Sequence, residues 1–259
     1  MPRPVGHWTK NKLDILTAYL PAYLSATTKA FERIYVDGFS GPGTNLVRDT
    51  GELIDGSPLI ALKATATNGT RFDRLYFVDK DPEVTEELKQ TIRPFDVDKR
   101  GVIKTADVND EIPRLLRKIP KLSPTFVLLD TDSIEPKWST IELLAQWQTE
   151  LLITFPLGMA INRNYESSKV VDFFGTDDCL IMLRPPVDVA GLLTLYKNRL
   201  VDLGYLHNPT FDRLVRTEGV TGQHLYYLIF VSKHHVGERI MKSVFSRPEA
   251  TGQMRFRLD

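Results

Sequence analysis

The chain contains little cysteine and carries no excess of charge of either sign. Cys179 is the single cysteine among 259 residues, which excludes an internal disulfide framework and any cysteine-based metal site. Lys plus Arg total 33 and Asp plus Glu also total 33. A dedicated nucleic-acid binder usually has a basic excess, because phosphate contacts dominate its affinity. Composition therefore does not favour a nucleic-acid substrate, although a local basic face is compatible with one.

Long apolar runs and familiar hydrolase motifs are also absent. No apolar run is long enough to span a bilayer, and the N-terminal MPRPVGHWTKNK lacks the apolar centre of a signal peptide. The sequence contains neither G-x-S-x-G nor H-E-x-x-H. His207, His224, His234 and His235 do not have the spacing of metal ligands. We therefore expect a cytoplasmic enzyme or binding protein without a membrane partner and without a metal site.

Short runs rich in Val, Ile, Phe and Leu alternate with segments of helical spacing. The predicted strands are 33–37, 74–79, 101–107, 125–130, 150–156 and, later, 223–233. The predicted helices are 57–65, 81–92, 108–119, 138–148 and 187–204. This alternation predicts an α/β fold with a mostly parallel sheet and helices on both faces. We expect the strand at 223–233 to pair antiparallel at the end of the sheet.

A helix is also predicted at the N-terminus, over residues 7–31. Leucines recur along one side of it, and Pro21 is expected to kink or divide it. No internal repeat, low-complexity tract or clear linker interrupts the sequence. We therefore predict a single domain, 1–259, with a helical element at its N-terminus.

Three glycines, Gly38, Gly41 and Gly43, follow the first predicted strand. Ligands of an open parallel sheet bind beyond the carboxyl ends of its strands. Glycine allows the backbone to turn sharply and to approach a ligand closely. The pattern thus indicates either a cofactor loop or a tight turn without a ligand. The spacing of the glycines and of the neighbouring acidic residues discriminates among the possible cofactors.

The spacing disfavours the commoner nucleotide motifs. A dinucleotide fold expects G-x-G-x-x-G and an acidic residue about 20 positions later, whereas this loop reads G-F-S-G-P-G. No Gly-Lys-Ser/Thr follows, so a P-loop is excluded as well. The carboxylate of Asp37 precedes the loop. S-adenosylmethionine has no pyrophosphate and carries a sulfonium and an ammonium group, so it suits this loop better. A nucleotide-binding oxidoreductase remains a weaker alternative.

Acidic residues end the next two strands. Asp79 is the candidate to accept both ribose hydroxyls, and Asp107 is the candidate for the adenine amino group, with Val108 supplying a backbone amide. Asp81 is expected to cap the following helix. Each acid alone is more often a loop or cap residue, but acids after three successive strands together indicate S-adenosylmethionine. Lys80, beside Asp79, is assigned to the same site, as are two residues of the glycine loop, Phe39 and Ser40.

The sequence resembles the three-Cys-motif partner proteins, a family related to class I methyltransferases. The similarity runs through HWTKNKLDILTAYLPAY, YVDGFSGPG, DGSPLIAL, FVDKDP, FVLLD, LLITFPLGMAINR and LYYLIFVSKH. It implies a Rossmann-like class I methyltransferase fold. It also implies an S-adenosylmethionine site at Asp37, Gly41, Gly43, Asp79 and Asp107, and a partner protein that carries the three-Cys motif.

Two further elements match the family. Trp8, Thr9 and Lys10 correspond to its N-terminal W-T-K element, which implies that Lys10 meets the carboxylate of the cofactor, unless it is a solvated lysine. Arg163 matches a family position after the fifth strand. It implies either a contact with an acidic acceptor or a packing or capping role.

One element departs from the family pattern. The family usually carries Asp-Pro-Phe/Tyr-Gly after its fourth strand, whereas this chain reads Asp130-Thr131-Asp132-Ser133. Stacking of a base on an aromatic ring contributes roughly 1–3 kcal/mol, so its loss argues against an ordinary nucleobase target. Either the acceptor differs, or Trp138 substitutes for the ring, or the site binds cofactor without turnover. The first hypothesis is a methyltransferase in which Asp130 positions or deprotonates the acceptor. The second is a cofactor-binding regulatory or partner subunit.

Overall fold

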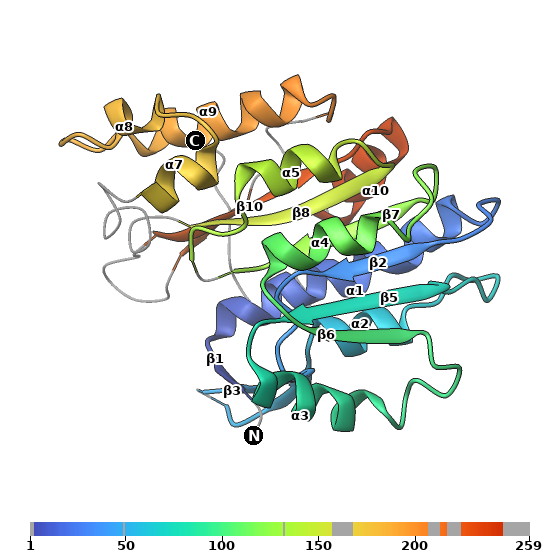
Figure 1. Cartoon of the computed structure of the whole chain (residues 1–259). Helices are drawn as coiled ribbons and strands as arrows, with labels where there is room; N and C mark the ends of the chain where they lie inside the picture. Colours follow the sequence, from blue (N-terminus) through green and yellow to red (C-terminus); the bar gives the residue numbers. More distant parts are fainter. Residues whose placement is uncertain are drawn as a thin grey trace.

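The computed structural model describes residues 3–48, 50–131, 133–156, 168–206, 213–216 and 224–245. Its main sheet has seven strands in the order β6-β5-β2-β7-β8-β10-β9 (Figure 1). Their bounds are β2 Ile34–Asp37, β5 Arg74–Asp79, β6 Gly101–Thr105, β7 Thr125–Leu129, β8 Thr149–Pro156, β9 Arg213–Arg216 and β10 His224–Val231.

The order of the strands in the main sheet reverses next to β2. From β2 the chain moves outward through β5 to β6, returns to the other side of β2 as β7, and continues to β8. All pairs among these five strands are parallel, whereas β10 runs antiparallel to both β8 and β9. This is a Rossmann-like fold, and the predicted mostly parallel sheet with an antiparallel C-terminal strand is confirmed. The reversal between β2 and β7 creates the crevice in which such sheets bind ligands.

Helices cover both faces of the sheet (Figure 1). Two buried hydrophobic clusters, one on each face, hold them there. One face carries α1 His7–Ala26, α2 Ser57–Lys63, α3 Pro82–Ile92 and α10 His235–Phe245. The other face carries α4 Val108–Leu116, α5 Trp138–Leu144, α7 Ser168–Phe174, α8 Cys179–Met182 and α9 Val189–Asp202. Among the described residues, no helix has both the length and the apolar composition needed to cross a membrane.

Alternate residues of the strands enter the two clusters. Ile34 and Val36 pack against the face of α4 and α5, while Tyr35 between them points to the face of α1. There its ring stacks on that of Phe126 with centroids 6.0 Å apart. Successive side chains of a strand point to opposite faces, and both faces are covered here. The sequences of these strands are therefore continuous apolar runs and do not alternate between apolar and polar residues.

Helix α1 is shorter than predicted and is not divided. It ends at Ala26 rather than at residue 31, and of the two predicted effects of Pro21, a kink or a division, the division does not occur. A proline in a helix interior costs about 3 kcal/mol. Leu16, Leu20 and Leu24 of this helix are fully buried, and burying one leucine contributes about 1.5–3 kcal/mol. The packing of the leucines therefore outweighs the cost of the proline.

A second, smaller sheet was not predicted. It consists of β1 Arg3–Val5, β3 Thr44–Val47 and β4 Leu53–Asp55, in the order β1-β3-β4. Strands β3 and β4 form an antiparallel hairpin directly after the glycine loop. Strands of three or four residues are too short to give a periodic pattern. The hairpin matters for function because it forms one wall of the recess described below.

Candidate functional site

Two recesses lie side by side at the carboxyl ends of β2, β5 and β7. The loop recess, about 200 Å³, is bordered by the glycine loop, α1 and the β3–β4 hairpin. The acidic recess, about 310 Å³, is bordered by the ends of β5, β6 and β7. Phe39 and Asp130 line both. Ligand pockets commonly have volumes of about 300–1,000 Å³, so the two recesses together suit one elongated ligand.

The glycine loop is an ordered turn fastened to the neighbouring strand. The amide of Gly41 donates to Asp79 Oδ2 at 3.1 Å, and the amide of Ser40 donates to the carbonyl of Val78 at 2.9 Å. Gly41 has φ +63°, and no atom lies within 4 Å of where its Cβ would be. The left-handed conformation favours glycine, and the empty space above Gly41 is where a ligand would approach the backbone.

Ser40 has a buried hydroxyl without a partner. The residue is only 5 % exposed and lines the loop recess. Its Oγ makes no hydrogen bond to any described residue. Buried polar groups are almost always paired, so an unpaired hydroxyl beside a recess fits a site that a polar ligand completes.

Asp37 lies behind the recesses rather than in their lining. Its carboxyl is fully buried and accepts hydrogen bonds from the Tyr35 hydroxyl at 3.3 Å, the Phe39 amide at 3.3 Å and the Ser57 hydroxyl. Burial raises the pKa of Asp37 to about 7, and these hydrogen bonds oppose the rise. Because Ser57 and Phe39 both line the loop recess, Asp37 supports the wall of the site and is separated from its lumen.

The acidic recess contains most of the other predicted cofactor residues. Asp79, Lys80, Asp107 and Val108 line it, together with Gly38. Asp79 Oδ1 accepts the amide of Asp81 at 3.0 Å, so its carboxylate holds the loops on both sides of it.

The two helix caps beside this recess are formed by aspartates. Asp107 caps α4, because its Oδ1 accepts the backbone amide of Asn109 at 2.8 Å and the side-chain amide of Asn109 at 3.0 Å, and the residue is exposed. The predicted cap of α3 by Asp81 is confirmed, because its carboxylate accepts from the amides of Glu83 and Val84.

Lys12 lines the loop recess, whereas Lys10, the lysine assigned to the site from the sequence, does not. Lys10 pairs with Glu52 at 2.9 Å and lines neither recess. Lys12 lines the loop recess, is 7 % exposed, and forms an ion pair with Asp130 Oδ1. The same oxygen accepts the Thr154 hydroxyl at 2.7 Å.

The helical period could have identified Lys12 as the lysine on the buried face of α1. Residues 12, 16, 20 and 24 are spaced by four and share one face of α1, and the last three are the fully buried leucines. Side chains at i and i+4 lie above one another on a helix. Lys12 is therefore in phase with the buried face, and Lys10 is not.

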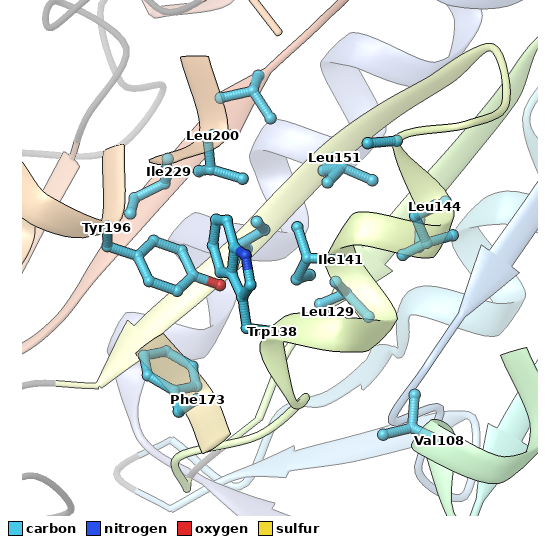
Figure 2. Packing of buried hydrophobic residues seen from close by; sticks show 14 of the residues in the cluster. Val108, Leu129, Trp138, Ile141, Leu144, Leu151, Phe173, Tyr196, Leu200 and Ile229 are labelled. Atoms are coloured by element: carbon cyan, nitrogen blue, oxygen red, sulfur yellow. The ribbon is translucent and has the colours of Figure 1, made fainter. Parts of the chain in front are cut away.

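Trp138 is a core residue and not a substitute for the missing aromatic ring. It is 2 % exposed and makes an edge-to-face contact with Tyr196, with centroids 5.3 Å apart. Figure 2 shows it in the buried cluster with Tyr196, Phe173 and Ile141, and it lines neither recess. Among the described lining residues of the two recesses, Phe39 is the one aromatic.

The loop after β7 is polar where the family carries an aromatic residue. Thr131 and Ser133 line the acidic recess and have their hydroxyl oxygens 3.1 Å apart. Asp132, Arg163 and the side chain of Trp8 lie outside the described residues. Within the described part of the chain, no three His, Cys, Asp or Glu residues are grouped so as to hold a metal ion.

Comparisons with known proteins support the fold. No family model and no curated protein sequence matches the chain. Protein LPL1258 from Legionella pneumophila is similar in structure, with a TM-score of 0.54 and 12% identity over 90% of both chains. An O-methyltransferase from Bacillus cereus, solved in complex with SAH, gives a TM-score of 0.47 at 12% identity over 86% of this chain and 81% of that one. At such identities the likeness concerns the fold alone, and the first of these structures agrees with the architecture derived above from the strand order.

Proposed function

We propose that this protein binds S-adenosylmethionine across the two recesses and is an S-adenosylmethionine-dependent methyltransferase. One observation carries the proposal. The carboxylate of Asp79 fastens the glycine loop through the Gly41 amide, at the junction of two recesses that meet at Asp130. The fold places this arrangement at the reversal of strand order, where sheets of this type bind ligands.

The acidic recess suits the adenosine end of the cofactor. Asp79 has further lone pairs for the two ribose hydroxyls, since each of its oxygens accepts one amide. Asp107 is exposed to the recess and suits the adenine amino group, and the buried side chain of Val108 supplies an apolar wall for the ring. Lys80 lies at the rim, 4.0 Å from Glu135.

The loop recess suits the amino-acid end. The unpaired Ser40 hydroxyl and the cation of Arg48 line it, while the Lys12 ammonium beside them is paired with Asp130. These groups match a carboxylate, which accepts hydrogen bonds and prefers charged donors. The glycine loop at Gly41 leaves the backbone open to the ligand.

The bound cofactor supplies an activated methyl group, and the chain supplies position. Asp130 lies at the junction of the recesses, and its carboxylate is suited to hold an N–H or O–H of the acceptor. Holding two reactants in line accounts for much of the acceleration in such reactions. Asp130 then acts as positioning group or as general base.

A cofactor-binding subunit without turnover is the second candidate. It is favoured by the loop after Asp130, where Thr131 and Ser133 provide no ring for stacking. Under this alternative the protein binds a partner protein. The resemblance to the three-Cys-motif partner proteins favours a partner that carries a three-Cys motif. Release of S-adenosylhomocysteine from S-adenosylmethionine separates the two candidates, because a subunit without turnover releases none with any cellular fraction, although it binds the cofactor and co-purifies with a partner.

Calorimetric titration with S-adenosylmethionine and S-adenosylhomocysteine tests the proposal. Replacement of Asp79 by Ala removes the loop anchor and the ribose acceptor. Hydrogen bonds to charged groups contribute about 1.5–3 kcal/mol each, so we expect the affinity for S-adenosylhomocysteine to fall about hundredfold. Asp73→Ala is the matched control, since Asp73 precedes the same strand at its opposite end and pairs with Arg33. Absence of binding to folded native protein at millimolar ligand would refute the proposal.

A further inference from the structure

The ion pair between Lys12 and Asp130 joins three elements at the point where the recesses meet. Lys12 comes from α1, Asp130 directly follows β7, and the ammonium lies 5.1 Å from the centroid of the Tyr226 ring on β10. A cation over an aromatic face is attracted by it. With 7 % exposure, Lys12 is held by packing as well as by charge.

This pair determines the charge that an acceptor meets. Both hydrogen bonds from described residues to Asp130, from Lys12 and from the Thr154 hydroxyl, fall on Oδ1. The ammonium balances the negative charge of the carboxylate, while Oδ2 keeps its acceptor capacity. The neighbouring carboxyl of Asp37 has its pKa raised to about 7 by burial, so near neutral pH it adds only part of a negative charge.

We propose that Lys12 is a positioning residue that neutralises Asp130, so that the site selects an acceptor with an uncharged N–H or O–H group rather than a protonated amine. The inference rests on the proposed function and narrows its substrate class to amides, aromatic amines and hydroxyl groups. A protonated amine has no lone pair to receive a methyl group. An unpaired carboxylate would favour that protonated form through its charge, whereas a neutralised one accepts a hydrogen bond without doing so.

Sinefungin provides a probe that needs no knowledge of the acceptor. It resembles S-adenosylhomocysteine but carries an amine, protonated at neutral pH, where S-adenosylmethionine carries its methyl group. The ratio of the two dissociation constants therefore reports the charge beside the transferred methyl. In the native protein we expect the two ligands to bind within about threefold of one another. In Lys12→Met, where Asp130 is left unbalanced, we expect sinefungin to gain about tenfold over S-adenosylhomocysteine.

Three variants sharpen the test. Lys12→Arg keeps the charge and is expected to keep the native ratio. Lys10→Met removes a lysine from the same helix but outside the recesses, and it should also leave the ratio unchanged. Asp130→Asn removes the negative charge of the carboxylate and keeps the Lys12 ammonium, so sinefungin is expected to lose about tenfold relative to S-adenosylhomocysteine.

The outcomes separate this inference from the function on which it rests. If S-adenosylhomocysteine does not bind the native protein, the proposed function fails. If it binds and the ratio is unchanged in both Lys12→Met and Asp130→Asn, the role of Lys12 is refuted while the function stands. Thermal unfolding of each variant identifies one that does not fold. If Lys12→Met is lost in this way, the direction of the change in Asp130→Asn decides the question.

Discussion

Two buried carboxyl groups, at opposite ends of the parallel strands of the main sheet, both have a raised pKa. We call the end of the sheet where the strands finish, and the end where they begin, its two edges. Asp37 ends β2 at the edge that carries the recesses, and Glu150 is the second residue of β8, at the opposite edge. Burial raises the pKa of each to about 7. In both cases hydrogen bonds from a tyrosine and a serine hydroxyl oppose the rise.

What surrounds the two groups is different. Glu150 accepts from Tyr19 at 2.5 Å and from Ser232 at 2.9 Å, and it lines neither recess. Asp37 accepts hydrogen bonds from Ser57 and Phe39, and both of these residues line the loop recess. A displaced pKa is therefore a consequence of burial at both edges. It points to a function only at the edge where a ligand can approach.

The largest effect is expected at the edge without a recess. The folded state holds a proton on Glu150 up to a pH of about 7, and the unfolded chain releases it near 4.5. The folded state thus binds more protons between these values. The contribution of Glu150 to stability is therefore fully present below pH 4.5 and is lost as the pH rises to about 7. Glu150→Gln should remove about 2–3 kcal/mol of the stability difference between pH 5 and pH 8, measured by urea unfolding.

Two controls accompany this variant. The exposed Glu86, which pairs with Lys89 on α3, is the matched site, and Glu86→Gln should leave the pH dependence as it is. The affinity of Glu150→Gln for S-adenosylhomocysteine should equal that of the native protein. A change in affinity of tenfold or more would show that the two edges are coupled and would break the comparison.

A smaller effect is expected from Asp37, and it involves the ligand. Near pH 7 the carboxyl is about half protonated, and a cation bound nearby favours the ionised form. We expect binding of S-adenosylmethionine to release up to about half a proton at this pH, and binding of the uncharged-sulfur product to release less. Titration calorimetry in buffers of different ionisation enthalpy counts the protons. The release should disappear in Asp37→Asn and persist in Glu150→Gln, and equal release by both ligands would contradict the idea.

The fold was predictable because the same sequence pattern, an apolar strand followed by a segment of helical spacing, recurs along the chain. Each buried strand, such as β5 or β7, is a continuous apolar run that ends close to an acid, and helical spacing separates one run from the next. The α3 cap at Asp81 is likewise local, since it depends on the two amides that follow it. Features that depend on a few neighbouring residues can be read from the sequence.

The remaining features depend on residues far apart along the chain. Pro21 stays in an unbroken helix because the leucines around it pack against the sheet, which local propensity does not express. Lys12 pairs with Asp130, which is 118 positions away in the sequence. Trp138 lies in the core, where it packs against Tyr196 of α9. Sequence pattern alone located the glycine loop after β2, but the side chains that meet at Asp130 come from elements distant in the sequence.

The smallest effect concerns one glycine at each edge of the sheet. Gly41 and Gly69 have φ of +63° and +84°, and neither has an atom within 4 Å of the place of a Cβ. Gly41 lines the loop recess, whereas Gly69 lies in the turn before β5, where its amide donates to Ala66 at 2.9 Å. An alanine in the left-handed region costs about 1 kcal/mol, so Gly41→Ala and Gly69→Ala should lower stability equally. Only Gly41→Ala should weaken binding of S-adenosylhomocysteine, by about tenfold, because its methyl group enters the space that the ligand needs. Equal affinities in the two variants would mean that the open space above Gly41 is not part of the site.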